Sequence, residues 1–105
     1  MSNFIDMCVQ GDVLLEEVDD FVDEWHEGAG NGVPLHTYLG MNRSEYSLWT
    51  VDPDVLPFVV AARREKRDVA EVIEQFHALP LAARADGPLA ARQLLKWLKS
   101  EGLWE

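Results

Sequence analysis

The chain has 105 residues, 48% of them hydrophobic, and a formal net charge of −10 at pH 7. This length and apolar content suit one folded domain over residues 1–105 and exclude a disordered chain. With one cysteine, Cys8, no secretory leader and no apolar run of the roughly 18 residues that cross a membrane, we expect an unprocessed cytoplasmic protein without disulfides.

The negative charge is concentrated in the first half of the chain. Residues 1–54 contain twelve carboxylates and one base, a balance of −11, whereas residues 55–105 contain eight bases and seven acids. Such an asymmetric field favours encounter with basic partners and disfavours nucleic acids and anionic membranes.

Residues 3–9 predict one or two helical turns, capped by Ser2 or Asn3 and interrupted by Gly11. The strongest helical pattern follows, from Val13 to Glu27, with Asp12 as the expected N-cap. Its apolar stripe contains Leu14, Leu15, Val18, Phe21, Val22 and Trp25. Its other faces carry seven acids and no base: Glu16, Glu17, Asp19, Asp20, Asp23, Glu24 and Glu27. A merely solvated surface is the alternative, but such a surface gains more from mixed charges, so we interpret this face as functional.

Residues 34–51 predict two short helices joined by a tight turn. The first begins at Pro34 and ends at Gly40. Asn42 and Glu45 have the spacing of a capping box, which predicts that the second helix begins there and ends at Asp52-Pro53. The turn glycine and the apolar Met41 and Leu48 make this segment similar to a repressor-like helix-turn-helix unit.

The second half of the chain predicts three more helices. Residues 54–67 suit a buried helix with Pro57 in its first turn and the basic run Arg63–Arg67 at its C-terminal end, where cations are favoured. Asp68 starts the next helix, which ends at Leu79-Pro80, and Asp86-Gly87-Pro88 starts the last one. No segment alternates with period two, so we predict an all-α fold: a compact bundle of about five or six short helices that includes the helix-turn-helix-like unit.

The sequence contains no recognisable catalytic or metal-binding constellation. Its three histidines, His26, His36 and His77, lie on different predicted elements and lack the close ligand pairs of a zinc site. The abundant carboxylates lie on an exposed face with no apolar wall to separate an acid from a base, and no nucleophile or dinucleotide motif is present. We therefore predict a protein that is not an enzyme and uses neither metal nor cofactor.

Three segments carry a resemblance to a known group of proteins. The runs DDFVDEWHEG (19–28), LHTYLGM (35–41) and EYSLW (45–49), followed by Leu56-Pro57, resemble a group of small, mostly uncharacterised bacterial and prophage proteins. The resemblance covers about residues 4–64. Members of that group are commonly encoded beside toxin-like genes, which implies an antitoxin or similar partner-binding role. Thr37 and Asn42 stand where the group would have Glu and Thr, so the resemblance implies that neither a charge nor a hydroxyl is essential there.

Our first prediction is an acidic partner-binding protein, antitoxin-like or inhibitor-like, that neutralises a basic toxin, nuclease or nucleic-acid enzyme through the acidic helix. The expected partner-binding residues are Glu16, Asp20, Asp23, Trp25, Glu27 and Trp49. The alternative is a helix-turn-helix transcriptional regulator, as a homodimer that exposes Arg63–Arg67 beside the motif. It would contact DNA through Asn42, Arg43, Ser44 and Ser47. The surrounding acids disfavour such direct nucleic-acid binding, because affinity for DNA depends on neutralising phosphates.

Overall fold

A computed structural model describes residues 3–80 and 87–104, and within these ranges the chain forms seven α-helices, two short 3₁₀ helices and no strand. The α-helices are α1 (Phe4–Gln10), α2 (Val18–His26), α3 (Leu35–Leu39), α4 (Arg43–Val51), α5 (Leu56–Glu65), α6 (Val69–His77) and α7 (Leu89–Ser100). The 3₁₀ helices are η1 (Leu15–Glu17) and η2 (Pro53–Val55). The all-α prediction is confirmed.

The predicted count of five or six helices is too low, because the shortest segments fold as complete capped helices. The Asn3 side chain accepts a hydrogen bond from the Asp6 N–H at 2.8 Å and caps α1, and Gly11 ends that helix in the left-handed conformation. Gly40 ends the five-residue α3 in the same way. Each short helix is therefore closed by its own glycine.

The acidic helix begins later than predicted. Leu14 is extended, and its N–H donates to the Glu17 carboxylate at 2.6 Å. Glu17 therefore supplies the cap that was expected from Asp12, so that the chain passes through η1 and becomes α-helical only at Val18. Leu14, predicted on the inner stripe, is 67% exposed as a result.

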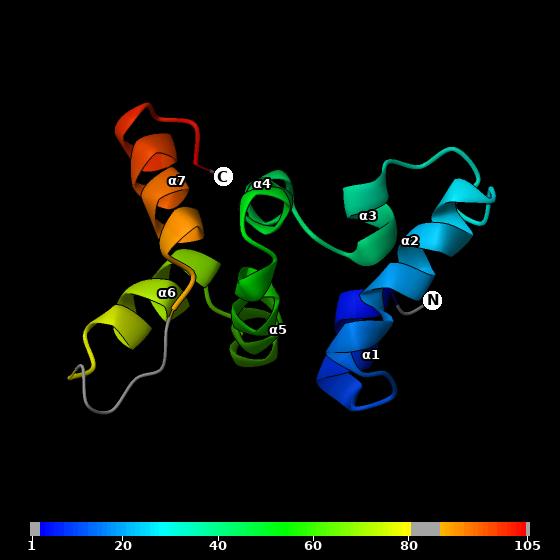
Figure 1. The fold of residues 1–105 in the computed structure, drawn as a ribbon, viewed down its shortest axis with the longest axis horizontal. Coiled ribbons are helices and arrows are strands. Elements are labelled where there is room, and N and C mark those ends of the chain that lie inside the picture. The colour runs from blue at the N-terminus through cyan, green and yellow to red at the C-terminus, as the bar shows by residue number, and fades with distance from the viewer. Residues whose placement is uncertain (1–2, 81–86, 105) are drawn as a thin grey trace.

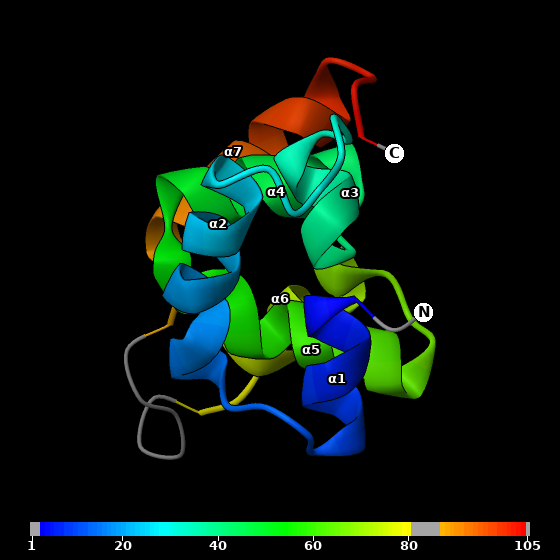
Figure 2. The same cartoon turned by 90° about the vertical axis from the view of Figure 1, so that its right-hand side faces the viewer.

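Helices α4 and α5 lie in the middle of the molecule, between α1, α2 and α3 on one side and α6 and α7 on the other (Figure 1). Helix α5 packs against both α1 and α6, and α4 packs against α7. The view from the side shows α1, α2 and α3 in front of these central helices (Figure 2). The largest fully buried side chains come from both sides: Phe4, Ile5, Leu39, Leu48, Val55, Val59, Val69, Ile73, Pro88 and Leu95.

Arg63 of α5 fixes the turn between α3 and α4. Its Nη1 donates to the carbonyl of Gly40, and its Nη2 donates to Oε1 of Glu45, both at 2.9 Å. The predicted capping box is confirmed: the Asn42 N–H donates to the same Glu45 oxygen at 2.9 Å, and the Glu45 N–H donates to Asn42 Oδ1 at 2.7 Å. The Glu45 side chain is only 6% exposed, so its charge is balanced by Arg63 and one N–H in a nearly dry site.

Gly40 is required both by its backbone conformation and by its surroundings. Its φ is +96°, and a Cβ at this position would overlap the Asn3 side chain. Asn3 is the cap of α1, so the absence of a side chain at Gly40 lets the start of α1 lie directly against the α3–α4 turn.

Two arginines of the basic segment at the end of α5, Arg63 and Arg67, are engaged within the protein. Arg67 donates to Glu65 at 2.9 Å, Glu71 at 3.4 Å and Gln75 at 2.8 Å. Across the α6–α7 contact, Arg92 donates through Nε to Glu74 at 3.1 Å. These bonds to Arg92 hold the pKa of the Glu74 carboxyl below its ordinary value.

We expect Gly40→Ala to destabilise the fold strongly, because the left-handed backbone alone costs about 1–3 kcal/mol for a non-glycine residue and the clash with Asn3 adds to it. The measurement is the free energy of unfolding in urea. Gly28→Ala is the matched control, since Gly28 has φ +99° but nothing within 4 Å of its would-be Cβ. Equal losses in the two variants would contradict a role for the Asn3 contact.

We expect Arg63→Ala to lower the free energy of unfolding by about 2–3 kcal/mol, because the buried Glu45 carboxylate and the Gly40 carbonyl both lose a charged donor. Arg92→Ala is the control, since its partner Glu74 is 46% exposed and such pairs contribute less than about 1 kcal/mol.

The stability contribution of the Arg92–Glu74 pair also depends on pH, and the direction of that dependence follows from the pKa of Glu74. Since the pKa of Glu74 is lowered in the folded protein, the pair stabilises the fold at neutral pH and loses that contribution as the pH falls through the folded pKa. The difference between wild type and Arg92→Ala should therefore vanish well below about pH 4. A loss from Arg63→Ala no larger than that from Arg92→Ala at neutral pH would refute the central role of Arg63.

Candidate partner-binding site

The predicted site residues Glu16 and Trp49 meet at one hollow, which we name the acidic pocket. It has a volume of about 400 Å³ and lies where the start of α2 approaches the end of α4 and the start of α5. Its lining residues are Leu15, Glu16, Val18, Asp19, Trp49, Pro53, Asp54, Leu56 and Pro57. The pocket thus joins two segments of the chain that the sequence alone did not connect.

The apolar floor of the pocket is buried, whereas its charged residues are exposed to solvent. Val18 and Leu56 are buried and form its floor, whereas the three carboxylate residues are exposed at its rim. Asp54 is positioned by η2, in which the Asp52 side chain accepts a hydrogen bond from the Asp54 N–H at 3.2 Å. The result is an apolar hollow with an acidic edge.

Trp49 supplies the aromatic wall of the acidic pocket. It is half-buried at the last turn of α4, and its ring lies 6.0 Å from that of Tyr46 on the same helix. Tyr46 in turn contacts His36 of α3 at 5.8 Å between ring centroids. This row of rings limits the movement of the Trp49 indole.

Within residues 3–80 and 87–104, the three rim carboxylates have no compensating base in the pocket. The acids of these ranges that form ion pairs with arginine are Glu45, Glu65, Glu71 and Glu74. Glu16, Asp19 and Asp54 are absent from those pairs, and no described Lys or Arg lines the pocket. Its local charge is therefore negative and directed to solvent.

The structure does not bring the remaining acids of the prediction into this pocket. Asp20, Asp23 and Glu27 are exposed along α2 and at its end, and none of them lines the hollow. Conversely, sequence reasoning did not single out Asp19 and Asp54 as site residues. Asp19 was visible only as one of seven acids, and Asp54 joins it only through the packing of η2 beside α2.

The Trp25 side chain makes contacts within the loop that follows α2. Its Nε1 donates to the Val33 carbonyl at 2.7 Å, and a Cβ at Gly30 would come within 2.5 Å of Trp25 Cδ1. The indole therefore closes the loop that connects α2 to α3, with Gly30 packed against it. Trp25 therefore has a structural role in this loop, and its role in partner binding stays a prediction.

Helix α7 and Leu103 lie beside the face of α4 that a DNA-binding protein would present. Arg43, Ser44 and Ser47 line a hollow of about 150 Å³ together with Leu98 and Leu103. Ser44 is only 4% exposed, and the Asn42 side chain is engaged in the cap of α4. The helix-turn-helix-like arrangement of α3 and α4 stays a prediction, although Met41 and Leu48 are buried as that motif requires.

Cys8 has the environment of a structural thiol. It is buried on α1, and this burial, reinforced by the negative charge of Glu17, raises the pKa of the thiol. A thiol that stays protonated is a poor nucleophile and a poor metal ligand. Among the residues that the structure describes, no group of three or more His, Cys, Asp or Glu side chains is arranged to hold a metal ion.

In the described part of the chain, no helix combines the length and apolar character that a membrane span needs.

No protein-family model matches the chain, and comparison with curated proteins and with solved structures finds no significant match.

We expect Trp25→Phe to lower the free energy of unfolding by about 1 kcal/mol, because a smaller aromatic ring remains while the indole N–H that donates to the Val33 carbonyl is lost. Unfolding in urea, followed by circular dichroism, measures this change. Trp97→Phe is the control, since Trp97 is 53% exposed on α7. Equal stability of the two variants would show that Trp25 does not hold the loop.

Proposed function

We propose that this chain is an acidic partner-binding protein, antitoxin-like or inhibitor-like, that neutralises a basic protein such as a toxin, a nuclease or a nucleic-acid enzyme. The observation that carries the proposal is the acidic pocket, in which three carboxylates surround an apolar hollow beside Trp49 and have no basic partner among the residues that the structure describes. The resemblance to proteins encoded beside toxin-like genes points the same way.

The chemistry of the pocket suits a lysine or arginine side chain. Such a side chain has an apolar stem and a charged end, and here the stem would lie on Val18 and Leu56 while the cation meets the rim carboxylates. Trp49 adds a face for a cation–π contact, which contributes about 0.5–2 kcal/mol. A neutral side chain could gain only the apolar contacts, and an acidic side chain would be repelled by the rim carboxylates.

The exposed acids outside the pocket serve a different part of the same function. Asp20, Asp23 and Glu27 extend the negative field along α2, which accelerates the approach of a basic surface. Because these acids are exposed, salt screens their effect over about 10 Å at 0.1 M. The acids along α2 thus speed association of the basic partner, and the acidic pocket slows its dissociation.

The DNA-binding alternative has weaker support. Ser44 is buried, Asn42 caps its own helix, and Leu98 and Leu103 lie beside Arg43 and Ser47. A recognition helix needs such side chains free to reach base edges and several phosphate contacts around them. The half of the chain that contains α4, residues 1–54, instead has a formal charge of −11.

The first experiment is to express the tagged chain in its native host and to identify what co-purifies, with and without nuclease, at about 50 mM and about 300 mM salt. A stoichiometric basic protein that salt releases and nuclease does not is the expected result. A defined DNA fragment recovered in its place would contradict the proposal and favour the regulator.

Two variants with equal net charge then locate the contact. Glu16→Gln/Asp19→Asn/Asp54→Asn neutralises the pocket, and Asp20→Asn/Asp23→Asn/Glu27→Gln neutralises three acids outside it. We expect the pocket variant to raise the dissociation rate of the captured protein at least about tenfold. The control variant should mainly slow association. Equal dissociation rates in the two variants would exclude the pocket as the contact, and thermal unfolding checks that both fold.

A further inference from the structure

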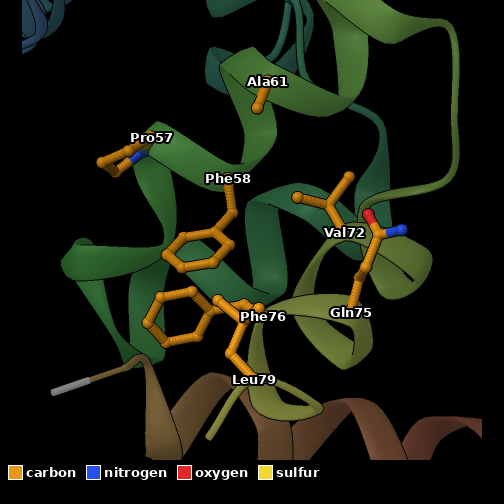
Figure 3. A pocket seen from close by; sticks show the side chains of 7 residues that line it. All are labelled: Pro57, Phe58, Ala61, Val72, Gln75, Phe76 and Leu79. Atoms are coloured by element: carbon orange, nitrogen blue, oxygen red, sulfur yellow. The ribbon is translucent and has the colours of Figure 1, made fainter. Parts of the chain in front are cut away.

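A second hollow lies between α5 and α6, and we name it the apolar groove. It has a volume of about 500 Å³ and is lined by Pro57, Phe58, Ala61, Val72, Gln75, Phe76 and Leu79. Figure 3 shows these side chains, with the rings of Phe58 and Phe76 facing each other. Their centroids are 5.1 Å apart in an edge-to-face arrangement.

Among the residues that the structure describes, the lining of the groove contains no charged side chain, and Gln75 is its one polar residue. The amide oxygen of Gln75 already accepts from Arg67 at 2.8 Å. Leu79 is 44% exposed at the end of α6, and Phe58 and Phe76 are half-buried. Exposed aromatic and aliphatic side chains gathered in a hollow favour apolar ligand groups.

Pro57 connects the apolar groove to the acidic pocket. This residue lines both hollows and is itself exposed in the first turn of α5. The pocket and the groove are therefore neighbouring parts of one surface, acidic on the α2 side of Pro57 and apolar on the α6 side. A ligand that fits the whole surface must itself have a basic part and an apolar part.

We propose that the apolar groove and the acidic pocket together bind one basic amphipathic segment of the partner protein, whose cation enters the pocket and whose apolar side chains enter the groove. This inference rests on the proposed function and adds what the pocket alone leaves open, namely how one basic protein is selected among many. Charge complementarity at the pocket chooses a basic segment, and the groove then requires apolar side chains beside the base. A peptide with basic side chains alone would fill only half of the surface.

The test uses synthetic peptides of about four helical turns and equal charge. The first carries lysines on one helical face and leucines on the other, the second replaces the leucines by alanine, and the third is a scrambled form of the first. Binding to the full chain is measured by calorimetry. The Lys/Leu peptide should bind at least about tenfold more tightly than either of the others.

Variants of the chain assign that difference to the groove. Leu79→Ser should remove most of the advantage of the Lys/Leu peptide while the affinity for the Lys/Ala peptide stays unchanged. Leu89→Ser is the matched control, because Leu89 is 61% exposed on α7 and lines neither hollow. The pocket variant Glu16→Gln/Asp19→Asn/Asp54→Asn should weaken both peptides.

The outcomes separate this inference from the proposed function. Equal affinity for the Lys/Leu and Lys/Ala peptides, with both weakened by the pocket variant, overturns the inference and leaves the proposed function standing. No effect of the pocket variant on either peptide overturns the proposed function. A dimer in sedimentation that Leu79→Ser converts to monomer would assign the groove to a second copy of this chain and overturn the inference.

Discussion

The contact of Arg63 with the α3–α4 turn is the constraint on which the arrangement of helices depends. One guanidinium donates to the Gly40 carbonyl and to the Glu45 carboxylate, and so joins α5 to the end of α3 and the start of α4. The same turn lies against the Asn3 cap of α1 through the missing side chain of Gly40. Four helices therefore meet at one set of partly buried polar contacts beside the apolar core.

This arrangement also determines where the acidic pocket forms. Once the start of α4 is held by Arg63, its other end brings Trp49 to the side of the molecule where η1 and α2 pass. The short η2 then turns the chain into α5, which places Asp54 and Pro57 beside Trp49. The pocket is thus a consequence of the packing of α4 and α5, and not of any local motif.

The sequence predicts those features whose causes are local. The capping box of Asn42 and Glu45 spans one helical turn, so its spacing is visible in the chain and the structure confirms it. The start of α2 was misplaced because two carboxylates, Asp12 and Glu17, compete to cap the same turn, and the sequence does not show which one reaches the free N–H. The seven helices were undercounted since each single-turn segment is marginal until its cap and its packing are known.

Only some residues of the candidate site could be predicted from the sequence, for a related reason. Glu16 and Trp49 could be selected by residue type, but Asp19 gains its significance from Asp54, and only tertiary packing brings the two together. The double role of Arg63 is hidden in the same way, because a base at the end of a helix is already explained by the helix dipole. Trp25 shows a related gap, since the sequence does not reveal that its indole N–H donates to the carbonyl of its own loop.

The internal pairing of the arginines has a consequence for how the molecule behaves before any contact is made. Arg63, Arg67 and Arg92 each donate to a carboxylate of this chain, whereas the acids along η1 and α2 remain outside these pairs. The centres of positive and negative charge therefore do not coincide, and the protein has a permanent dipole moment with its negative end at α2. A positively charged body approaching from any side exerts a torque on this dipole, so the molecule rotates to present α2 to it first.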